Sequence, residues 1–512
     1  MHARHPVFAP KWRDATRRSG LGALLLVVSP CVLAADVDGS RLSAVWALPF
    51  VGMLLSIALA PLLVLRFWHR HYGKVALGWA MATLVPMAMI LGPGVAWSGL
   101  AHTLLAEYLP FIILLLSLYT ISGGIYVRGN LHGGPLLNTT VLAVGGLLAS
   151  VMGTTGASML LIRPWIRMNK YRITGHHIAF FIFIVSNVGG CLTPIGDPPL
   201  FMGYLKGVPF WWVAEHCWPM WAVGIGTLLA MFFFVDSLNY RRAPKPVRDR
   251  ETAQEIWRFN GLVNLFFLAV ILAAVFVKAP PFLREGLMIA AALGSYFTTH
   301  KSVHEANHFD FHPIKEVAVL FIGIFATMMP ALDWLALKSA DLGHPSPAFF
   351  YWGSGVLSSV LDNVPTYMSF LEAIFGSSIS PEVVQQVQHL IAGGGADLAT
   401  VTGPHAEQVR ATFAALQTYH AADLAKGAVD LEHIEVAFLL GNTAFNKFIL
   451  AISVGAVFFG ANTYIGNGPN FMVKSIADQQ KVHTPTFLGF VFRYTLPFMV
   501  PMLILVWWLF FR

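Results

Sequence analysis

The sequence predicts an all-α polytopic membrane protein built from two inverted repeats. Each repeat would hold about five transmembrane helices and a re-entrant hairpin, with discontinuous helices at the midplane. Of the 512 residues, 56% are hydrophobic and 12% charged, against about 25% charged in soluble domains. Many apolar runs approach the roughly 20 residues that span a bilayer, and a Gly/Pro-rich motif occurs twice. The net charge of +7 is therefore attributed to loops, and no nucleic-acid partner is expected.

The N-terminus has the three regions of a secretory signal. A basic stretch, KWRDATRRSG, precedes the apolar run GLGALLLVVSPCVLA, in which Val32 and Ala34 supply small residues near the end. The apolar run is short for a spanning helix. We therefore expect a cleavable signal peptide at 1–35, with an uncleaved extra helix as the alternative.

Two sets of apolar segments follow, separated by a charged linker. The first repeat, 44–236, is predicted to contain spans at 44–65, 75–97, 106–127 and 210–236, a hairpin at 138–162 and a broken helix at 176–205. The second repeat, 259–511, is predicted to contain spans at 259–277, 283–299, 315–337 and 488–511, a hairpin at 347–375 and a broken helix at 434–475. Between them, 237–258 is assigned as a cytoplasmic linker. Residues 377–432 are polar and are assigned as an extramembrane insertion.

Basic residues set the expected orientation. Lys and Arg cluster at 66–74, 163–172 and 237–258, and these stretches share one side if both hairpins enter and leave on the same side. The positive-inside rule makes that side cytoplasmic. We therefore expect a multi-pass protein of the cell inner membrane whose mature N-terminus and C-terminus are periplasmic. Counting the first hairpin as a full span would place the basic linker outside.

The motif GCLTPIGDPPLFM (190–202) is echoed by GANTYIGNGPNFM (460–472). Seven of the thirteen positions are identical: Gly190/Gly460, Thr193/Thr463, Ile195/Ile465, Gly196/Gly466, Pro199/Pro469, Phe201/Phe471 and Met202/Met472. The hairpins echo more faintly, as SVMGTTGASMLL (150–161) and SVLDNVPTYMSF (359–370). Paired Gly/Pro-broken segments in two inverted halves indicate the substrate site of a secondary transporter.

A carboxylate in each half lies beside these breaks. Asp197 follows Gly196, and Asp362 precedes Asn363 in the second hairpin. A charge at the bilayer centre costs at least about 2.5–3.5 kcal/mol, and a bound Na⁺ or proton would offset that cost. We predict a Na⁺ site at Asp197, Asp362 and Asn363. Further oxygen ligands suited to a hard cation are predicted at Thr366, Ser186, Asn187, Thr193, Gly196, Thr154, Thr155, Ser158, Asn462, Thr463, Asn467 and Asn470.

Simpler roles exist for the same residues. Asp197 and Asp362 could each cap the half-helix that follows, and the Asn and Thr side chains could only satisfy freed backbone groups. Lys447 is the one basic residue well inside a predicted span, 13 residues before Gly460. It is either a counter-charge for the acids or a side chain that snorkels to a membrane face. The cysteines and histidines show no metal-ligand spacing, and no cofactor is expected.

The strings SNVGG-x-x-TPIGDPP and LDNVPT, with the two hairpins, resemble the ion transporter superfamily over nearly all of 44–511 except the insertion. Its members include arsenite permeases, citrate transporters, divalent anion/sodium symporters and NhaD-type sodium/proton antiporters. The Gly-Asp and Asp-Asn pairs are most similar to the NhaD-type and arsenite-permease side. That resemblance implies cation binding and proton exchange at Asp197 and Asp362, with Asn363 and Thr366 beside the latter. The first hairpin tip, GTTGAS, lacks the acid of arsenite permeases, and neither tip has the Ser-Asn-Thr of dicarboxylate symporters.

The leading functional prediction is a Na⁺(Li⁺)/H⁺ antiporter that works by alternating access, with cation and protons competing for Asp197 and Asp362. A cation-coupled citrate or dicarboxylate transporter is the first alternative, and an arsenite-type anion efflux permease the second. An enzyme is not expected, because no nucleophile–base pair or phosphate loop is evident. The expected partners are small ions or carboxylate anions and the lipid bilayer. A homodimer is expected from the resemblance, since relatives are often dimers.

Overall fold

The computed structural model describes residues 42–128, 133–244, 246, 258–277, 279–343, 345–393, 398, 401–427 and 429–512. Helices dominate this part of the chain, and eight of those described are long and apolar enough to cross a membrane. The chain is therefore an all-α polytopic membrane protein, as predicted. The expected signal peptide at 1–35 lies outside the described residues.

The first three spans begin and end elsewhere than predicted. A 3₁₀ turn, η3 (Ala44–Ala47), leads into α2 (Leu48–Leu63), and after Val64 alone α3 (Leu65–Ile90) begins. The basic stretch 66–74 is thus helical and not a loop. The next break falls at Gly92, whose φ of 103° suits glycine and ends the helix, and Pro93 starts α4. Gly followed by Pro is a strong stop-and-start signal that the predicted break at 98–105 overlooked.

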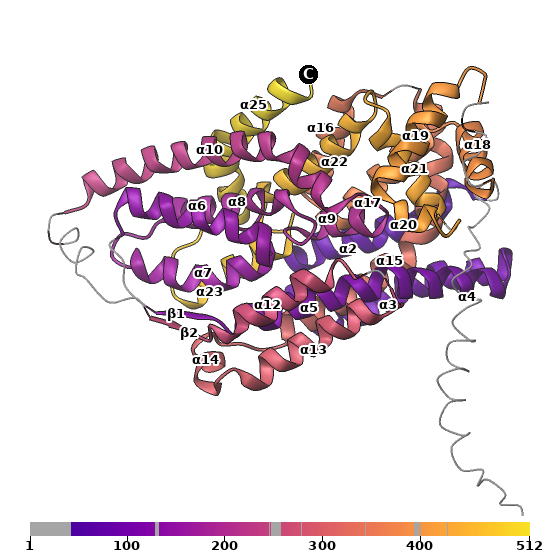
Figure 1. Ribbon diagram of the computed structural model, residues 1–512. Coiled ribbons are helices and arrows are strands. Elements are labelled where there is room, and N and C mark those ends of the chain that lie inside the picture. Colours follow the sequence, from indigo (N-terminus) through magenta and orange to yellow (C-terminus); the bar gives the residue numbers. More distant parts are fainter. Residues whose placement is uncertain are drawn as a thin grey trace, which may run out of the picture.

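The rest of the first half holds a helical hairpin and a broken helix. The chain runs through α4 (Pro93–His102), the π-helical η4 (Thr103–Tyr108), α5 (Leu109–Gly123), α6 (Pro135–Met152), α7 (Thr154–Met168), α8 (Gly175–Ile184), η5 (Val188–Leu192), α9 (Pro198–Leu205) and α10 (Phe210–Arg242). Helices α6 and α7 pack side by side (Figure 1). Helix α10 runs six residues into the predicted linker, and of that linker 245 and 247–257 lie outside the described residues.

The second half also holds a helical hairpin and a broken helix. It holds α12 (Val263–Ala274), α13 (Leu283–Thr298), α14 (Lys301–Ala306), α15 (His312–Ser339), η6 (Ala340–Leu342), the hairpin α16 (Pro347–Ser358) and α17 (Asn363–Ser378), then α22 (Asn446–Phe459), η8 (Gly460–Asn462), α23 (Gly468–Gln479), α24 (Phe487–Phe490), η9 (Val491–Met499) and α25 (Val500–Phe510). The predicted broken helix 434–475 has a further bend of 104°, between α21 (Leu431–Gly441) and α22.

The insertion is helical. It contains α18 (Pro381–Ala392), α19 (Ala406–Tyr419) and α20 (Ala421–Leu424). Helices α18 and α19 pack against each other and against α21, at one end of the molecule (Figure 1). The segment therefore forms a small helical unit seated on the second half.

A two-stranded antiparallel ribbon, which the sequence did not predict, joins the two halves. Strand β1 (Tyr126–Arg128) pairs with β2 (Arg258–Asn260), with Val127 opposite Phe259. Strand β1 follows α5 and strand β2 precedes α12, so the ribbon joins the end of α5 to the start of α12. The Asn264 side chain strengthens the junction by donating to Gly124 O (2.8 Å) and Thr299 Oγ1 (2.9 Å).

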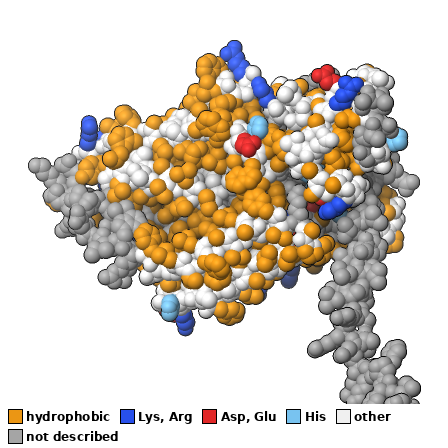
Figure 2. Space-filling model, in the orientation of Figure 1, with side chains coloured by type: hydrophobic (Ala, Val, Ile, Leu, Met, Phe, Trp, Pro, Cys, Tyr) orange, Lys and Arg blue, Asp and Glu red, His pale blue; other side chains and the backbone are white. Residues whose placement is uncertain are grey.

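The apolar surface agrees with a membrane environment. Large hydrophobic side chains are exposed all over the outside, among them Met89, Phe297, Leu63 and Leu136. Figure 2 shows apolar side chains covering most of the visible face, with few charged ones among them. Side chains in α8 and α22 are by contrast almost completely buried. These two helices therefore run through the protein interior, and both lead into broken segments.

Candidate functional site

Asp197 lies at the centre of the interrupted segments. It is the N-cap residue of α9, followed by two prolines, and its side chain is fully buried. Three side chains donate to its carboxylate: Thr154 Oγ1 to Oδ1 (2.8 Å), Asn467 Nδ2 to Oδ1 (3.2 Å) and Asn363 Nδ2 to Oδ2 (2.6 Å). A buried carboxylate requires such donors, because unpaired it would be very costly. Asp197 therefore links three segments that are far apart in the sequence.

Those three donors and Asp197 each stand at the start of a different helix. Thr154 is the first residue of α7 and Asn363 the first of α17, and Asn467 is the N-cap of α23. Helix N-termini carry partial positive charge and unsatisfied N–H groups. The starts of α7, α9, α17 and α23 thus converge on one buried point, and this is an environment that favours negative charge.

The loops before α9 and α23 have the same internal bonds. Thr193 Oγ1 donates to Ser150 O (2.5 Å) and Thr463 Oγ1 donates to Ser359 O (2.6 Å). Each hydroxyl also accepts from the glycine three residues on, Gly196 N (3.2 Å) or Gly466 N (3.1 Å). The two threonines correspond in one sequence alignment, and the two serines correspond in the other. Each threonine therefore bonds its loop to the hairpin of the same half, at equivalent positions.

Both loops also depend on glycine at the same place. A Cβ built on Gly196 would collide with the backbone of Gly190, and one built on Gly466 would collide with Gly460 O. The four glycines are paired in the sequence repeat. Their lack of side chains allows the chain to fold back on itself beside the site.

The remaining predicted ligands form a polar layer around this point. Ser158 and Ser186 are bonded to each other (2.8 Å). Asn467 donates also to Ser186 O and Asn187 Oδ1, and Asn187 Nδ2 donates to Asn470 Oδ1 (2.7 Å). Asn470 donates in turn to Gly460 O and Thr463 O. These groups position the two loops and Asn467, and Asn467 alone among them reaches Asp197.

Asp362 has a different environment from Asp197. It is half-buried and caps α17, accepting from Val364 N at 3.1 Å. Thr366 Oγ1 donates to the backbone oxygen of Asp362, one turn back in the same helix. Asp362 therefore acts as the N-cap of α17 in this structure. The contact with Asp197 is made by the next residue, Asn363.

Three predicted residues lie beside or outside this cluster. Thr155 is half-buried and lines a cavity of about 20 Å³ with Gly153 and Gly196, room for about one water molecule. Asn462 Nδ2 donates to Ser359 Oγ (2.9 Å) and so joins the second loop to the second hairpin. Lys447 is exposed at the second residue of α22, next to the 104° bend. Its exposed side chain is therefore not one of the buried groups around Asp197.

Two buried oxygens near the breaks accept no hydrogen bond within the described residues. These are Oδ1 of Asn363 and Oδ1 of Asn462. An amide oxygen is a good ligand for Na⁺-like cations. Since Nδ2 of Asn363 already contacts Asp197, its Oδ1 and that carboxylate together offer oxygen ligands from both halves of the chain.

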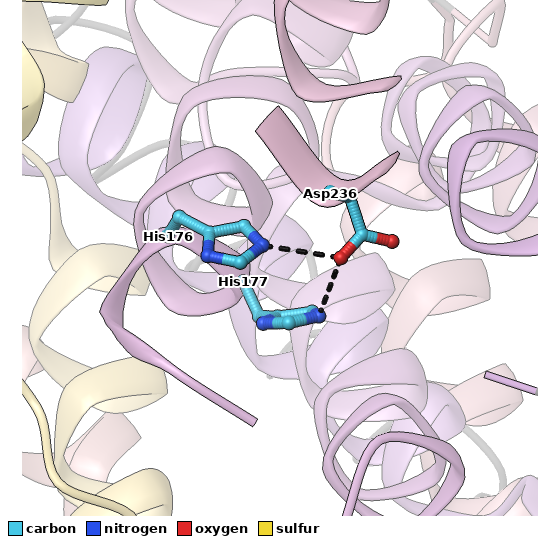
Figure 3. A group of neighbouring side chains, drawn as sticks. All are labelled: His176, His177 and Asp236. Atoms are coloured by element: carbon cyan, nitrogen blue, oxygen red, sulfur yellow. Dashed lines mark hydrogen bonds and ion pairs between the residues drawn. The ribbon is translucent and has the colours of Figure 1, made fainter. Parts of the chain in front are cut away.

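A second buried charge cluster was not predicted from the sequence. Figure 3 shows His176 and His177 of α8 pointing toward Asp236 of α10; their Nε2 atoms lie 3.2 and 3.1 Å from Asp236 Oδ1. Arg172 pairs with both oxygens of the same carboxylate. The sequence did contain a signal, because the acidic Asp236 follows the apolar run MFFFV. It was overlooked because Asp236 was taken as the last residue of the predicted span 210–236.

A third charge cluster was also missed. Lys206, between α9 and α10, contacts Glu107 Oε1 of η4 at 2.8 Å and also pairs with Glu432 of α21. Glu107 is the second residue of the predicted apolar span 106–127, and an acid inside that span was the available signal. The cluster therefore links the C-terminal end of α9 to η4 in the first half and to α21 in the second half.

Known proteins with similar sequences show the family. A family model described as "Putative citrate transport" matches residues 39–511. The chain belongs to this citrate-transport family. The "46 kDa membrane protein" of Mycobacterium leprae (strain TN) is 26% identical over 249 residues, which are 46% of this chain and 58% of the relative. The chain thus aligns with little more than half of that relative's length. The resemblance to the ion transporter superfamily is confirmed, because this family is a member of it.

Proposed function

We propose that this protein is a cation-coupled transporter of citrate-like carboxylates that works by alternating access in an inner membrane. The observation that carries the proposal is the convergence of four helix N-termini on the buried carboxylate of Asp197. N-terminal ends and hydroxyl or amide donors are suited to anions. In this structure they hold the protein's own carboxylate, and a substrate carboxylate needs the same groups.

The donors couple the cation to the anion. When Na⁺ or a proton neutralises Asp197, that carboxylate requires fewer hydrogen bonds, and Thr154, Asn363 and Asn467 can then turn to a substrate carboxylate. The orphaned Asn363 Oδ1 supplies a further oxygen for the cation. Cation binding therefore promotes anion binding, and the two move together. The local cavity of about 20 Å³ is too small for citrate, so the segments must separate to admit it.

The matched loops support the alternating-access part of the proposal. The Thr193–Ser150 and Thr463–Ser359 bonds join each broken helix to the hairpin of its own half. Each loop and hairpin can therefore move as one body, and the bonds from Asn363 and Asn467 to Asp197 bridge the two bodies. Two such halves in inverted orientation would open the site to opposite sides in turn.

Na⁺/H⁺ antiport is the second candidate, favoured by the burial of Asp197 next to an amide oxygen with no partner in the described chain. In that scheme cation and proton compete for Asp197 and no anion is needed. Citrate-family membership and the convergence of four helix N-termini on Asp197 favour the carboxylate transporter. The two schemes differ in whether an anion moves.

The test is transport by the purified protein in proteoliposomes. Labelled citrate uptake is measured with inward gradients of Na⁺, Li⁺, K⁺ or H⁺, and internal pH is followed with a trapped dye. We expect citrate accumulation that depends on Na⁺ or H⁺ and that is lost in Asp197→Asn. Cation-driven proton movement without citrate, and no citrate uptake, would instead identify an antiporter.

A further inference from the structure

A second group of ligand atoms lies where the helical insertion meets α21, away from the Asp197 site. His420 lies between α19 and α20, Asp423 lies in α20 and His433 in α21. One ligand atom from each lies within 4.8 Å of the others. The two imidazole rings are stacked, with centroids 4.5 Å apart. Two imidazoles and a carboxylate in this arrangement have the composition of a three-residue zinc site with an open position.

The first half of the chain holds this group in place. His420 Nε2 lies 3.1 Å from the backbone oxygen of Gly207. A carbonyl oxygen only accepts, so Nε2 carries the proton and the lone pair is on Nδ1. Histidines that bind metals commonly donate their other ring N–H to a backbone carbonyl, and this fixes the tautomer and the ring orientation.

Gly207 also makes room for the other histidine. It has a φ of 109°, and a Cβ on it would lie 2.6 Å from Cδ2 of His433. The absence of a side chain at 207 therefore lets the His433 ring lie against the backbone whose oxygen contacts His420. One residue of the loop between α9 and α10 thus positions both imidazoles.

The group opens onto a cleft that attracts cations. His420, Asp423 and His433 line a cavity of about 680 Å³, together with the carboxylates of Asp430, Glu215 and Glu285. Arg284 also lines it, and is paired with Glu285 at 2.7 Å. The cavity offers a path to the ligands, and Glu215 and Asp430 add negative charge along it.

We propose that His420, Asp423 and His433 bind a divalent transition-metal ion of the Zn²⁺ class. Nitrogen and oxygen ligands in this ratio suit Zn²⁺ better than Mg²⁺ or Ca²⁺, which prefer oxygen alone. Zn–ligand distances of about 2.0–2.2 Å require the three side chains to move slightly closer on binding. The open position faces the cavity and takes a water molecule or a small anion.

The site joins two parts of the protein that must move if the proposed transport cycle is correct. Gly207 follows Lys206, which pairs with Glu432, the neighbour of His433. Bound metal would tie α20 to α21 beside Gly207, to which His420 is bonded at the C-terminal end of α9, the helix that begins at Asp197. We expect it to slow transport; this consequence rests on the proposed function, whereas metal binding does not.

The buried His176–His177–Asp236 group is not a comparable site. It has the same composition, but the Arg172 guanidinium pairs with both oxygens of Asp236. A permanent positive charge in contact with the shared ligand disfavours a second cation there. The two groups thus form a natural internal comparison within one chain.

Metal binding by the full-length protein in detergent tests the proposal. The metal-free protein is titrated with Co²⁺, whose visible absorption reports a tetrahedral site, and Zn²⁺ is then added in competition. We expect one Zn²⁺ per chain that displaces Co²⁺. The affinity should fall at least about tenfold in His420→Ala, His433→Ala and the isosteric Asp423→Asn, since one of three ligands is lost in each.

His389→Ala is the matched control, because His389 is exposed on α18 in the same insertion. It should bind the metal like the parent protein. Elution volume and thermal unfolding without metal show which variants remain folded, and Asp423→Asn is the variant least expected to disturb packing. Zn²⁺ binding that is equal in the parent protein, Asp423→Asn and the His420→Ala/His433→Ala double variant would overturn the proposal, as would no binding by the parent.

Discussion

The segments 190–202 and 460–472 fold in nearly the same way but differ in charge. Each turns back on a pair of glycines, each bonds its threonine to a serine carbonyl of the hairpin, and each starts a short helix with a proline near its beginning. At the N-cap, however, one has Asp197 and the other Asn467, and the asparagine donates to the aspartate. The repeated backbone provides the architecture, and a single acid makes the pocket asymmetric.

The hairpin tips show the same division. Thr154 and Asn363 correspond in the alignment, and both donate to Asp197. Their preceding residues differ: Gly153 turns with a φ of 81°, while Asp362 caps the helix. A repeated scaffold thus presents donors from both halves to one acceptor. Substitutions at these paired positions test whether function requires that asymmetry.

Removing the acid should have the largest effect. Asp197→Asn keeps the shape but removes the carboxylate that the coupling cation neutralises in the proposed cycle, so a cation gradient can no longer drive uptake. We expect uptake of labelled citrate into proteoliposomes to fall by at least about 100-fold. Asp478→Asn, an exposed acid on α23, is the control and should transport normally. Undiminished uptake by Asp197→Asn would contradict the assignment.

Removing one donor from either hairpin should have similar, smaller effects. Thr154→Val and Asn363→Leu each delete one hydrogen bond to Asp197, so uptake should fall about tenfold in each. Thr140→Val is the control, because Thr140 is an exposed threonine of α6 that bonds within its own helix. If only one of the two donor variants loses activity, the hairpins do not contribute equally.

Removing either loop threonine should affect stability equally. Thr193→Val and Thr463→Val each delete a partly buried bond from the loop to its hairpin, and each should lower the free energy of unfolding by about 1 kcal/mol. Thermal unfolding in detergent gives the two shifts side by side. A large shift in one variant with none in the other would show that the matched loops are not equivalent in energy.

Asp362→Asn should have the smallest effect. Asparagine caps helices about as well as aspartate, so the bond to Val364 N survives and uptake should stay within about threefold of the parent. The same uptake assay measures it. A loss as large as that of Asp197→Asn would mean that Asp362 is a cation ligand, as the sequence prediction had it, and not only a cap.

The sequence predicted the architecture of this site because the repeat is local. Gly190, Gly196, Thr193 and their partners are visible as identities within thirteen residues, and the physics of broken helices in a bilayer then indicates where they belong. The all-α class followed from composition alone. Asp197 was identified for the same reason, as an acid inside a helix break.

Long-range pairing was not predictable from one sequence. Nothing near Arg172 indicates that it meets Asp236, and nothing near Lys206 indicates Glu107 and Glu432, because these contacts depend on how distant helices pack. The pairing of β1 with β2 across the linker had no local signal either. The start of α3 at Leu65 was missed because a single residue, Val64, makes the turn.

Citrate affinity measured by calorimetry at increasing Na⁺ and at decreasing pH tests the central claim most directly. If the donors around Asp197 pass to the substrate when a cation neutralises that acid, citrate must bind more tightly as the cation rises, and the cation more tightly as citrate rises. In Asp197→Asn the dependence should vanish. Citrate binding that weakens with added cation, or that keeps its full cation dependence without Asp197, would contradict the account.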